Sequence, residues 1–484
     1  MRFHAVLRYI SFALILDAIF LAISTLVGVI YGDSSIFPLF YTTLITILIA
    51  LFPIIFVPPT TSITNKEGLL IVVGSWLMSC LIGAVPYILW GGEFTFTNAV
   101  FESVSGFTTT GSTILQNIEA VPHGLLFWRA STHWIGGIGI IIFVLSVLPA
   151  SGIVGLVLFR SEVSSVAQEN FKQRANKAIQ IITGVYLVLT LAETLLLVLF
   201  GMNLFDAITH SFATIATGGF SPKNASIAYY NSVAIETVIL VFMILSGIHF
   251  VLLYAAVTGK TKQFWKSPVV KYYLLIMLFA TVVIAIGIHH QTYKTWFEAF
   301  RYSAFQVLSV GTSTGFATAD SNVWPGYSHL ILIFLSLQCA GAGSTSGGIK
   351  ADRVVLFWKA FVRQIKRVMY PNAVIPIKMG DSSVKDQLVS NSVLYIGIYL
   401  MIVFISTLLL SMLGVSLTEA FSGSVATIGN VGPGFGSVGT TGNFAQVPLL
   451  GKWIFSIVML VGRLEIFAFF IFFTPRQWSK SISY

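Results

Sequence analysis

Charged residues are scarce in this chain: Asp, Glu, Lys and Arg together make up only 9 % of its 484 residues. Soluble domains carry about 25 % charged residues, so a soluble globular fold is excluded for most of the chain. Hydrophobic residues reach 56 %, and the mean hydropathy is +0.88. Most side chains must therefore face lipid or other apolar helices, and the composition predicts an all-α polytopic membrane protein.

Cysteines are few and catalytic motifs are missing. The two cysteines, Cys80 and Cys339, have no spacing that predicts a disulfide or a metal site. The eight histidines are scattered and form no HExxH-type ligand set. An intramembrane hydrolase would need an activated nucleophile, but the sequence has no GxSG motif and no paired intramembrane aspartates. We predict that the protein is not an enzyme and holds no cofactor.

What the chain has instead is a series of long apolar runs. A bilayer-spanning helix needs about 20 mainly apolar residues. The first run is too long and too interrupted, by Asp17, for a signal peptide, and we predict that it stays in the mature protein. The predicted spans are residues 9–31, 37–57, 69–90, 125–149, 177–200, 231–257, 269–290, 327–368 (interrupted), 388–413 and 447–473.

Four segments between these spans repeat one pattern, in which a short helix-like stretch ends at a Thr-rich or Gly-rich turn. They are FESVSGFTTTG (101–111), HSFATIATGG (210–219), FQVLSVGTSTG (305–315) and GSVATIGNVG (423–432), with final glycines about 100 residues apart. In three repeats an Asn, Asp or Glu followed by Ala lies thirteen residues before the final glycine, namely Asn98-Ala99, Asp206-Ala207 and Glu419-Ala420. In the third repeat Glu298-Ala299 lies seventeen residues before it.

The repeats predict four re-entrant pore loops around one axis. Non-helical backbone at membrane depth must line protein or a water-filled path. Glycine allows successive carbonyls to point one way, and a ring of carbonyls can replace the hydration shell of an ion. The filter has no carboxylate, which favours a monovalent cation such as K⁺ over calcium. The predicted filter residues are Thr109, Thr110, Gly111, Thr217, Gly218, Gly219, Ser313, Thr314, Gly315, Asn430, Val431 and Gly432.

The predicted organisation is two leading helices (1–68) followed by four units of helix, pore loop and helix, at 69–160, 161–262, 263–370 and 371–484. Glu102 and Gln306 lie at matching positions behind the filter, where we expect them to hydrogen-bond the loops.

Basic residues are concentrated in alternate loops, which follows the positive-inside rule with both termini cytoplasmic. The net charge of +9 is then explained by topology and attraction to acidic lipid, and no nucleic-acid partner is needed. The inner cations are Arg160, Lys172, Arg174, Lys177, Lys260, Lys262, Lys266, Lys271, those from Lys350 to Lys385, Arg476 and Lys480; the outer loops carry Asp33, Glu93, Glu119 and Asp320, with Lys223 and Lys294 as exceptions.

The eighth span is interrupted by CAGAGSTSGGIK (339–350), followed by a second apolar helix beginning near Ala351. This composition cannot make a good helix, and broken helices in transporters line the permeation path. We interpret the segment as a gating loop beneath the filter, with an ordinary cytoplasmic turn as the alternative. Its glycines are Gly341, Gly343, Gly347 and Gly348.

Arg463 lies inside the last predicted span. A charge there is costly and normally faces the bundle interior or water, so we predict that Arg463 points to the pore. A structural ion pair with Asp17, Glu193 or Glu236 is the alternative.

Together, the four filter turns, the GAGSTSGGIK loop and the GRLEIF sequence resemble the Trk/Ktr/HKT superfamily of potassium transporters, and the two extra leading helices resemble its TrkH-type bacterial branch. The resemblance covers essentially the whole chain. It implies a potassium-uptake subunit of the bacterial inner membrane, a homodimer with one pore per protomer, and control by a cytosolic nucleotide-binding ring of the TrkA/KtrA type.

By this resemblance the filter maps to the runs ending at Gly111, Gly219, Gly315 and Gly432, the gating loop to Gly341–Gly348, and the pore-facing arginine to Arg463. Two departures leave the register open: Gly218 and Gly219 are adjacent in repeat two, and Asn430-Val431-Gly432-Pro433 differs from the Thr-Gly pattern in repeat four.

Two functions remain after the hydrolase is set aside. The first is a gated potassium-selective pore driven by the membrane potential. The second is a Na⁺- or H⁺-coupled symporter that works by alternating access. It would need an ionisable relay within the membrane, for which Asp17, Glu193 and Glu236 are the candidates.

Overall fold

The chain forms a bundle of long helices with loops that turn back inside it. The computed structural model describes all residues except 1, 61–62, 148–167, 381, 465 and 473–484. Among the described residues, six helices are long and apolar enough to cross a bilayer, and one bent pair is a seventh candidate. The predicted boundary at 160–161 and the cations Arg160, Arg476 and Lys480 lie outside the described residues.

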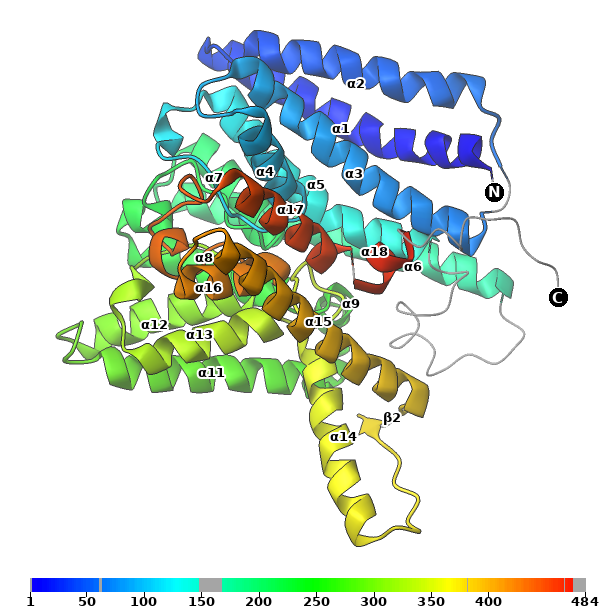
Figure 1. Ribbon diagram of the computed structural model, residues 1–484, viewed down its shortest axis with the longest axis vertical. Helices are drawn as coiled ribbons and strands as arrows, with labels where there is room; N and C mark the ends of the chain where they lie inside the picture. Colours follow the sequence, from blue (N-terminus) through cyan, green and yellow to red (C-terminus); the bar gives the residue numbers. More distant parts are fainter. Residues whose placement is uncertain (1, 61–62, 148–167, 381, 465, 473–484) are drawn as a thin grey trace.

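The helices follow the predicted order of two leading helices and four units. The leading pair is α1 (Phe3–Tyr31) and α2 (Ile36–Phe56), which pack on each other and on α3 (Figure 1). The units contain α3 (Asn65–Trp90), α4 (Phe96–Phe107) and α5 (His123–Val147); α6 (Gln168–Leu199), α7 (Leu204–Ile215), α8 (Val233–Ser246), α9 (Phe250–Val257) and α10 (Thr261–Lys266); α11 (Pro268–Ile288), α12 (Trp296–Gly311), α13 (Gly326–Gln338) and α14 (Ala351–Met369); and α15 (Asp386–Met412), α16 (Leu417–Ile428), α17 (Leu449–Arg463) and α18 (Ile466–Phe472).

Each unit also has a short 3₁₀ helix after its pore loop. A small antiparallel hairpin lies between α14 and α15 and pairs Lys378 with Ser383. These elements are η1 (Ile118–Ala120), η4 (Ser226–Tyr230), η5 (Ser321–Val323), η6 (Gly436–Val438), β1 (Lys378–Met379) and β2 (Ser382–Ser383).

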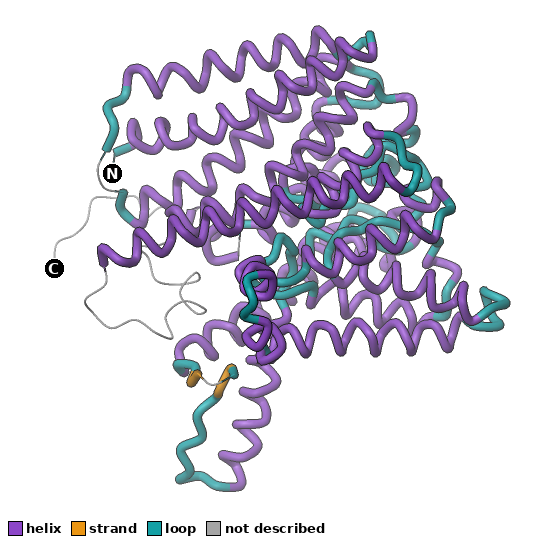
Figure 2. Tube along the Cα trace, turned by 180° about the vertical axis from the view of Figure 1, so that it is seen from behind, coloured by secondary structure: helices purple, strands orange, loops and turns teal. Residues whose placement is uncertain are grey.

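The short helices α4, α7, α12 and α16 occupy the predicted re-entrant positions, and the loops that follow them lie among the long helices (Figure 2). Most of the buried apolar side chains of the described bundle form two large clusters. Repeats two and three build one cluster, and the leading helices with repeats one and four build the other. The predicted all-α polytopic fold is confirmed.

Two of the predicted spans are wrong in detail. The run 231–257 is not one helix, because α8 and α9 meet at a break of Gly247, Ile248 and His249 with a bend of 107°. The helix after the gating loop, α14, is amphipathic and not apolar: Arg363 and Lys366 lie on the same helix as the exposed Trp358 and Phe361. It projects away from the bundle (Figure 1).

Candidate functional site: four filter loops and an intramembrane loop

A capping signal starts each of the four pore helices. The side chains of Thr95, Asn203, Thr295 and Ser416 accept hydrogen bonds from the backbone N–H groups of Asn98, Asp206, Glu298 and Glu419, respectively. These four acceptors are the N-cap residues, so the repeated Asn/Asp/Glu-Ala pair marks the third and fourth helical positions. The longer spacing in repeat three follows because α12 has 16 residues where the other three have 12, about one extra turn.

All four pore helices end in the same way. Two residues before each filter glycine the backbone is left-handed, with φ of 53° at Thr109, 55° at Thr217, 61° at Ser313 and 53° at Asn430. In repeat one, Thr109 N–H donates to the Gly106 carbonyl and Thr110 N–H to the Ser105 carbonyl, both at 2.9 Å, and the other repeats have the same pair. This is the Schellman arrangement. It uses the amides of the turn and not its carbonyls, of which the Gly432 carbonyl accepts from Ser112 Oγ at 3.0 Å.

The same conformations fix the register of repeats two and four. Gly219, and not Gly218, matches the other filter glycines, since its φ is +82° and those of Gly111 and Gly315 are +82° and +80°. Gly432 matches too, with a φ of +101°. The Asn-Val-Gly turn therefore has the geometry of the Thr-Gly turns although its side chains differ.

The four filter glycines form a closed ring with the carbonyls of their neighbours. A Cβ added to Gly111 would overlap the Gly218 carbonyl oxygen of repeat two, and one on Gly219 would overlap the Thr314 oxygen of repeat three. One on Gly315 would overlap the Val431 oxygen, and one on Gly432 would lie 2.6 Å from the Thr110 oxygen of repeat one. The loops therefore surround one axis in sequence order, and carbonyl oxygens from all four meet there.

The segment between α13 and α14 lies directly against these loops. Thr345 Oγ1 donates to the carbonyl of Ile215, at the end of pore helix α7, at 2.9 Å. Gly347 N–H donates to Ser313 Oγ of the third filter loop at 3.1 Å. A Cβ on Gly347 would overlap the Gly429 carbonyl of repeat four. The loop contacts three repeats, which is incompatible with an ordinary surface turn.

Arg463 holds this loop from the side. Its guanidinium donates to the Thr345 carbonyl at 2.6 Å and to the Gly136 carbonyl of α5 at 2.9 Å, and the residue is only 4 % exposed. Arg463 thus joins repeat four, the loop and repeat one.

None of the three acids considered as partners for Arg463 pairs with it. Asp17 accepts from Ser79 Oγ at 2.6 Å, and Glu236 forms an ion pair with Arg301 at 2.7 Å. Glu193 is fully buried, and among the described residues its carboxyl oxygens have no hydrogen-bond partner. Thr214 lies near it, but the Thr214 hydroxyl donates to the His210 carbonyl at 2.8 Å.

The four glycines predicted for the gating loop are not equivalent. Gly343 and Gly348 have φ of +77° and +72°, and an added Cβ would strike His249 and Cys339. Gly347 is packed against backbone. Gly341 has ordinary space, with Val269 Cγ1 at 3.6 Å and the Gly247 carbonyl at 3.7 Å from the added atom.

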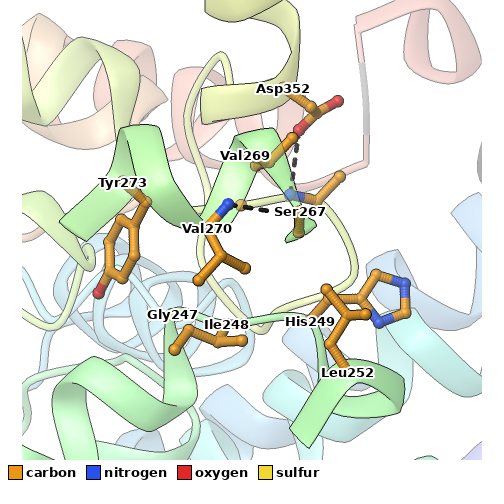
Figure 3. Close-up of a pocket in the computed structure, with 11 residues that line it drawn as sticks. Gly247, Ile248, His249, Leu252, Ser267, Val269, Val270, Tyr273 and Asp352 are labelled. Carbon is orange, nitrogen blue, oxygen red and sulfur yellow. Dashed lines mark hydrogen bonds between the residues drawn. The ribbon is translucent and has the colours of Figure 1, made fainter. Parts of the chain in front are cut away.

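Gly341 has this space because a cavity of about 50 Å³ lies between the start of the loop, the α8–α9 break and α11. Figure 3 shows Val269 and Val270 of α11 on one side of it and Gly247, Ile248 and Leu252 on another. The break is tied to the loop, because Gly341 N–H donates to the Gly247 carbonyl at 3.2 Å and Phe250 N–H to the Gly343 carbonyl at 3.3 Å. Gly247, within an apolar run, is the one sign of this contact that can be read from the sequence.

Similar proteins give this geometry a context. Residues 40–482 match the TrkH family, described as a cation transport protein. The Trk system potassium uptake protein TrkH of Escherichia coli K12 is 34 % identical over 99 % of this chain and 100 % of its own length. TrkG of the same organism is 31 % identical over 86 % of each chain. The crystal structure of the potassium transporter TrkH from Vibrio parahaemolyticus superposes with a TM-score of 0.90 at 32 % identity, covering 99 % of this chain and 100 % of that one.

Proposed function

This chain belongs to the TrkH family of cation transport proteins, and from that premise we propose that it is a potassium-selective transporter mediating K⁺ uptake across a bacterial inner membrane. The observation that carries the proposal is the closed ring of four loops, in which each filter glycine faces a carbonyl of the next repeat. Neutral carbonyl oxygens can replace the hydration shell of K⁺. The membrane potential, worth about 2.3 kcal/mol per charge per 100 mV, would drive uptake.

In this proposal the segment Gly341–Gly348 is the gate. It lies beneath the filter, bonded to Ile215 and Ser313 and held by Arg463, so ions can pass only when it moves. A cytosolic nucleotide-binding ring of the TrkA/KtrA type would move it. Gly341 N–H is hydrogen-bonded to the Gly247 carbonyl just before α9, so a movement of α9 and α10 caused by the ring would also move the proposed gate.

We also propose that the protein is a homodimer with both termini cytoplasmic. Helix α14 projects from the bundle and exposes apolar side chains, including Trp358 at 63 % and Val368 at 75 %. An exposed apolar surface on a helix that also carries cations is typical of a protein–protein interface, and a second protomer would bury it.

Ion flux into proteoliposomes with K⁺, Rb⁺, Na⁺ or Li⁺ tests the proposed function. We expect flux of K⁺ and Rb⁺ well above that of Na⁺, driven by an imposed potential with no second ion gradient. Equal flux of all four ions would contradict potassium selectivity.

The alternative, a coupled symporter, is favoured by one observation: Glu193 is buried, and its carboxyl oxygens have no hydrogen-bond partner in the part of the chain that the structure describes. A proton relay would stop in Glu193→Gln, whereas a simple pore would continue. We expect K⁺ flux in Glu193→Gln within about twofold of wild type, because among the described residues Glu193 bonds neither a filter loop nor the proposed gating loop, and glutamine has nearly the same size and shape. Asp17→Asn tests the second buried candidate for the relay in the same assay, and we expect its flux to be retained as well. Loss of flux together with loss of pH dependence in Glu193→Gln would instead establish coupling.

The gate can be tested with a pair of glycine substitutions. In Gly347→Ala the methyl group would overlap the Gly429 carbonyl, so the loop must leave its position, and we expect higher unregulated flux. In Gly341→Ala the methyl group enters the neighbouring cavity, and its burial stabilises the observed position of the loop by about 0.8 kcal/mol. We therefore expect flux equal to or lower than that of wild type. Flux measured without any regulatory partner distinguishes them. Identical behaviour of the two variants would show that the loop does not gate.

A further inference from the structure

One position behind the filter is occupied differently in each repeat. Nine residues before the filter glycine lie Glu102, His210, Gln306 and Gly423. Glu102 accepts from Ile114 N–H at 3.0 Å and from Thr113 Oγ1 at 2.9 Å, and Gln306 donates to the Ala319 carbonyl. As expected from the sequence, these side chains hold the chain that leaves the filter.

The sequence did not indicate that Glu102 is also half of a buried ion pair. Arg129 of α5 donates from Nε to Glu102 Oε1 at 2.6 Å. The two side chains are 3 % and 0 % exposed. The same guanidinium donates from its other arm to the Ser221 carbonyl at 3.0 Å and lies 3.4 Å from the ring centre of Phe220. Phe220 and Ser221 directly follow the filter glycine of repeat two, so Arg129 joins filter loops one and two.

The connection continues to the equivalent position of repeat two. His210 Nδ1–H donates to the Asp206 carbonyl at 2.7 Å, so Nε2 is free to accept from Ser221 Oγ at 3.0 Å. A continuous buried polar chain thus runs from Glu102 through Arg129 and Ser221 to His210. It links the two equivalent positions behind adjacent filter loops.

Repeats three and four have no such bridge among the described residues. Gln306 bonds only within its own repeat, and Gly423 has no side chain, so its neighbour Ser422 accepts from Phe435 N–H at 2.8 Å instead. Filter loops one and two are therefore joined by a charged, planar group, whereas loops four and one are joined by neutral bonds, from Asn430 Nδ2 to Thr110 Oγ1 and from Ser112 Oγ to the Gly432 carbonyl, both at 3.0 Å. His133 of α5 adds a neutral contact to loops one and two, since its Nδ1 bonds the Gly106 carbonyl and its Nε2 accepts from Phe220 N–H at 3.2 Å.

We propose that Arg129 is a positioning residue for ion selectivity: by bonding Glu102 and the Ser221 carbonyl together, it sets the distance between the first and second filter loops. This inference rests on the proposed potassium selectivity. A guanidinium offers two separate donor arms in a rigid plane, whereas an ammonium is a point charge. Lysine in its place can keep the contact with Glu102 but cannot hold the Ser221 carbonyl in the same geometry.

The test is the K⁺-over-Na⁺ flux ratio of Arg129→Gln and Arg129→Lys in proteoliposomes. We expect Arg129→Gln to lower the ratio about tenfold, the size of effect that follows from losing one charge-assisted hydrogen bond to the filter. Arg129→Lys should fall between this variant and wild type. Total K⁺ flux should change less than the ratio, because the pore itself remains.

Arg301→Gln is the matched control, measured together with thermal stability. Arg301 pairs with Glu236 through two bonds of 2.7 Å, on pore helix α12, and within the described residues that pair bonds no filter segment. We expect it to lower stability but leave the flux ratio unchanged. A wild-type ratio in Arg129→Gln, or an equal fall in Arg301→Gln, would overturn the assignment. A wild-type protein without K⁺ preference would instead overturn the proposed function.

Discussion

Replacing Gly315 with serine is expected to reduce the K⁺-over-Na⁺ flux ratio by roughly 5- to 150-fold, the factor that corresponds to a strain of about 1–3 kcal/mol at one residue. Gly315 has a φ of +80°, and any Cβ there would overlap the Val431 carbonyl oxygen of the next loop. The serine must therefore push that carbonyl away from the axis or distort its own turn. Either movement widens the ring, and a wider ring no longer compensates for the dehydration of K⁺ better than of Na⁺.

Gly184→Ser provides the control for this substitution. Gly184 lies in α6, has ordinary φ, and an added Cβ would meet nothing within 4 Å. We expect it to leave the flux ratio unchanged. An unaltered ratio in Gly315→Ser would show that selectivity does not reside in the carbonyl ring.

The second large effect is expected at Arg463. Its two hydrogen bonds, to the Thr345 and Gly136 carbonyls, connect the proposed gating loop to repeats one and four. Hydrogen bonds to a charged group contribute about 1.5–3 kcal/mol each. Arg463→Gln should therefore raise the equilibrium constant between the open and closed states of the proposed gate by about tenfold or more. In the proposed gate, the substitution also removes a positive charge that would oppose cations beneath the filter. We expect a clear rise in K⁺ flux measured without a regulatory partner.

Arg463→Lys separates the two causes of that rise. Lysine keeps the charge but cannot reach both carbonyls with the same geometry. Flux near wild type in Arg463→Lys would indicate that charge dominates, and flux like that of Arg463→Gln would indicate that the tether dominates. If Arg463→Gln leaves flux unchanged or lowers it, the arginine does not hold the gate closed.

The sequence was sufficient for the architecture and for the four loops, because each depends on local chemistry. Long apolar runs predict spans. The turn of each loop needs a glycine, because its backbone has a positive φ that residues with a side chain rarely adopt. The repeated Asn/Asp/Glu-Ala pair was recognised as a pattern, although its physical meaning is the helix cap three residues earlier, at Thr95 and its equivalents. That signal was present in the sequence and could have been used.

The features that were missed depend on contacts between distant segments. Residues 233–257 are mostly apolar, and the break at Gly247 is explained only by hydrogen bonds with Gly341 and Gly343, which lie about 90 residues further along the chain. The bridge formed by Arg129 was equally invisible, since Glu102 and Ser221 belong to different repeats. Helix α14 differs from the predicted apolar helix because cations are interleaved with its apolar residues, and the resulting helix is amphipathic.

The hydrogen bonds of the gating loop have a thermodynamic consequence. Thr345 Oγ1 donates to the Ile215 carbonyl, and Gly347 N–H donates to the Ser313 hydroxyl. In the proposed gate this is the closed arrangement, and these two oxygens lie at the inner end of the filter. When the loop moves, these acceptors must bind water or a cation, because buried polar groups are seldom left unpaired. The loop and the inner cation are then competing ligands for the same oxygens. Reciprocity requires that whatever opens the loop tightens cation binding there, and that cations at the inner end favour the open loop to the same degree.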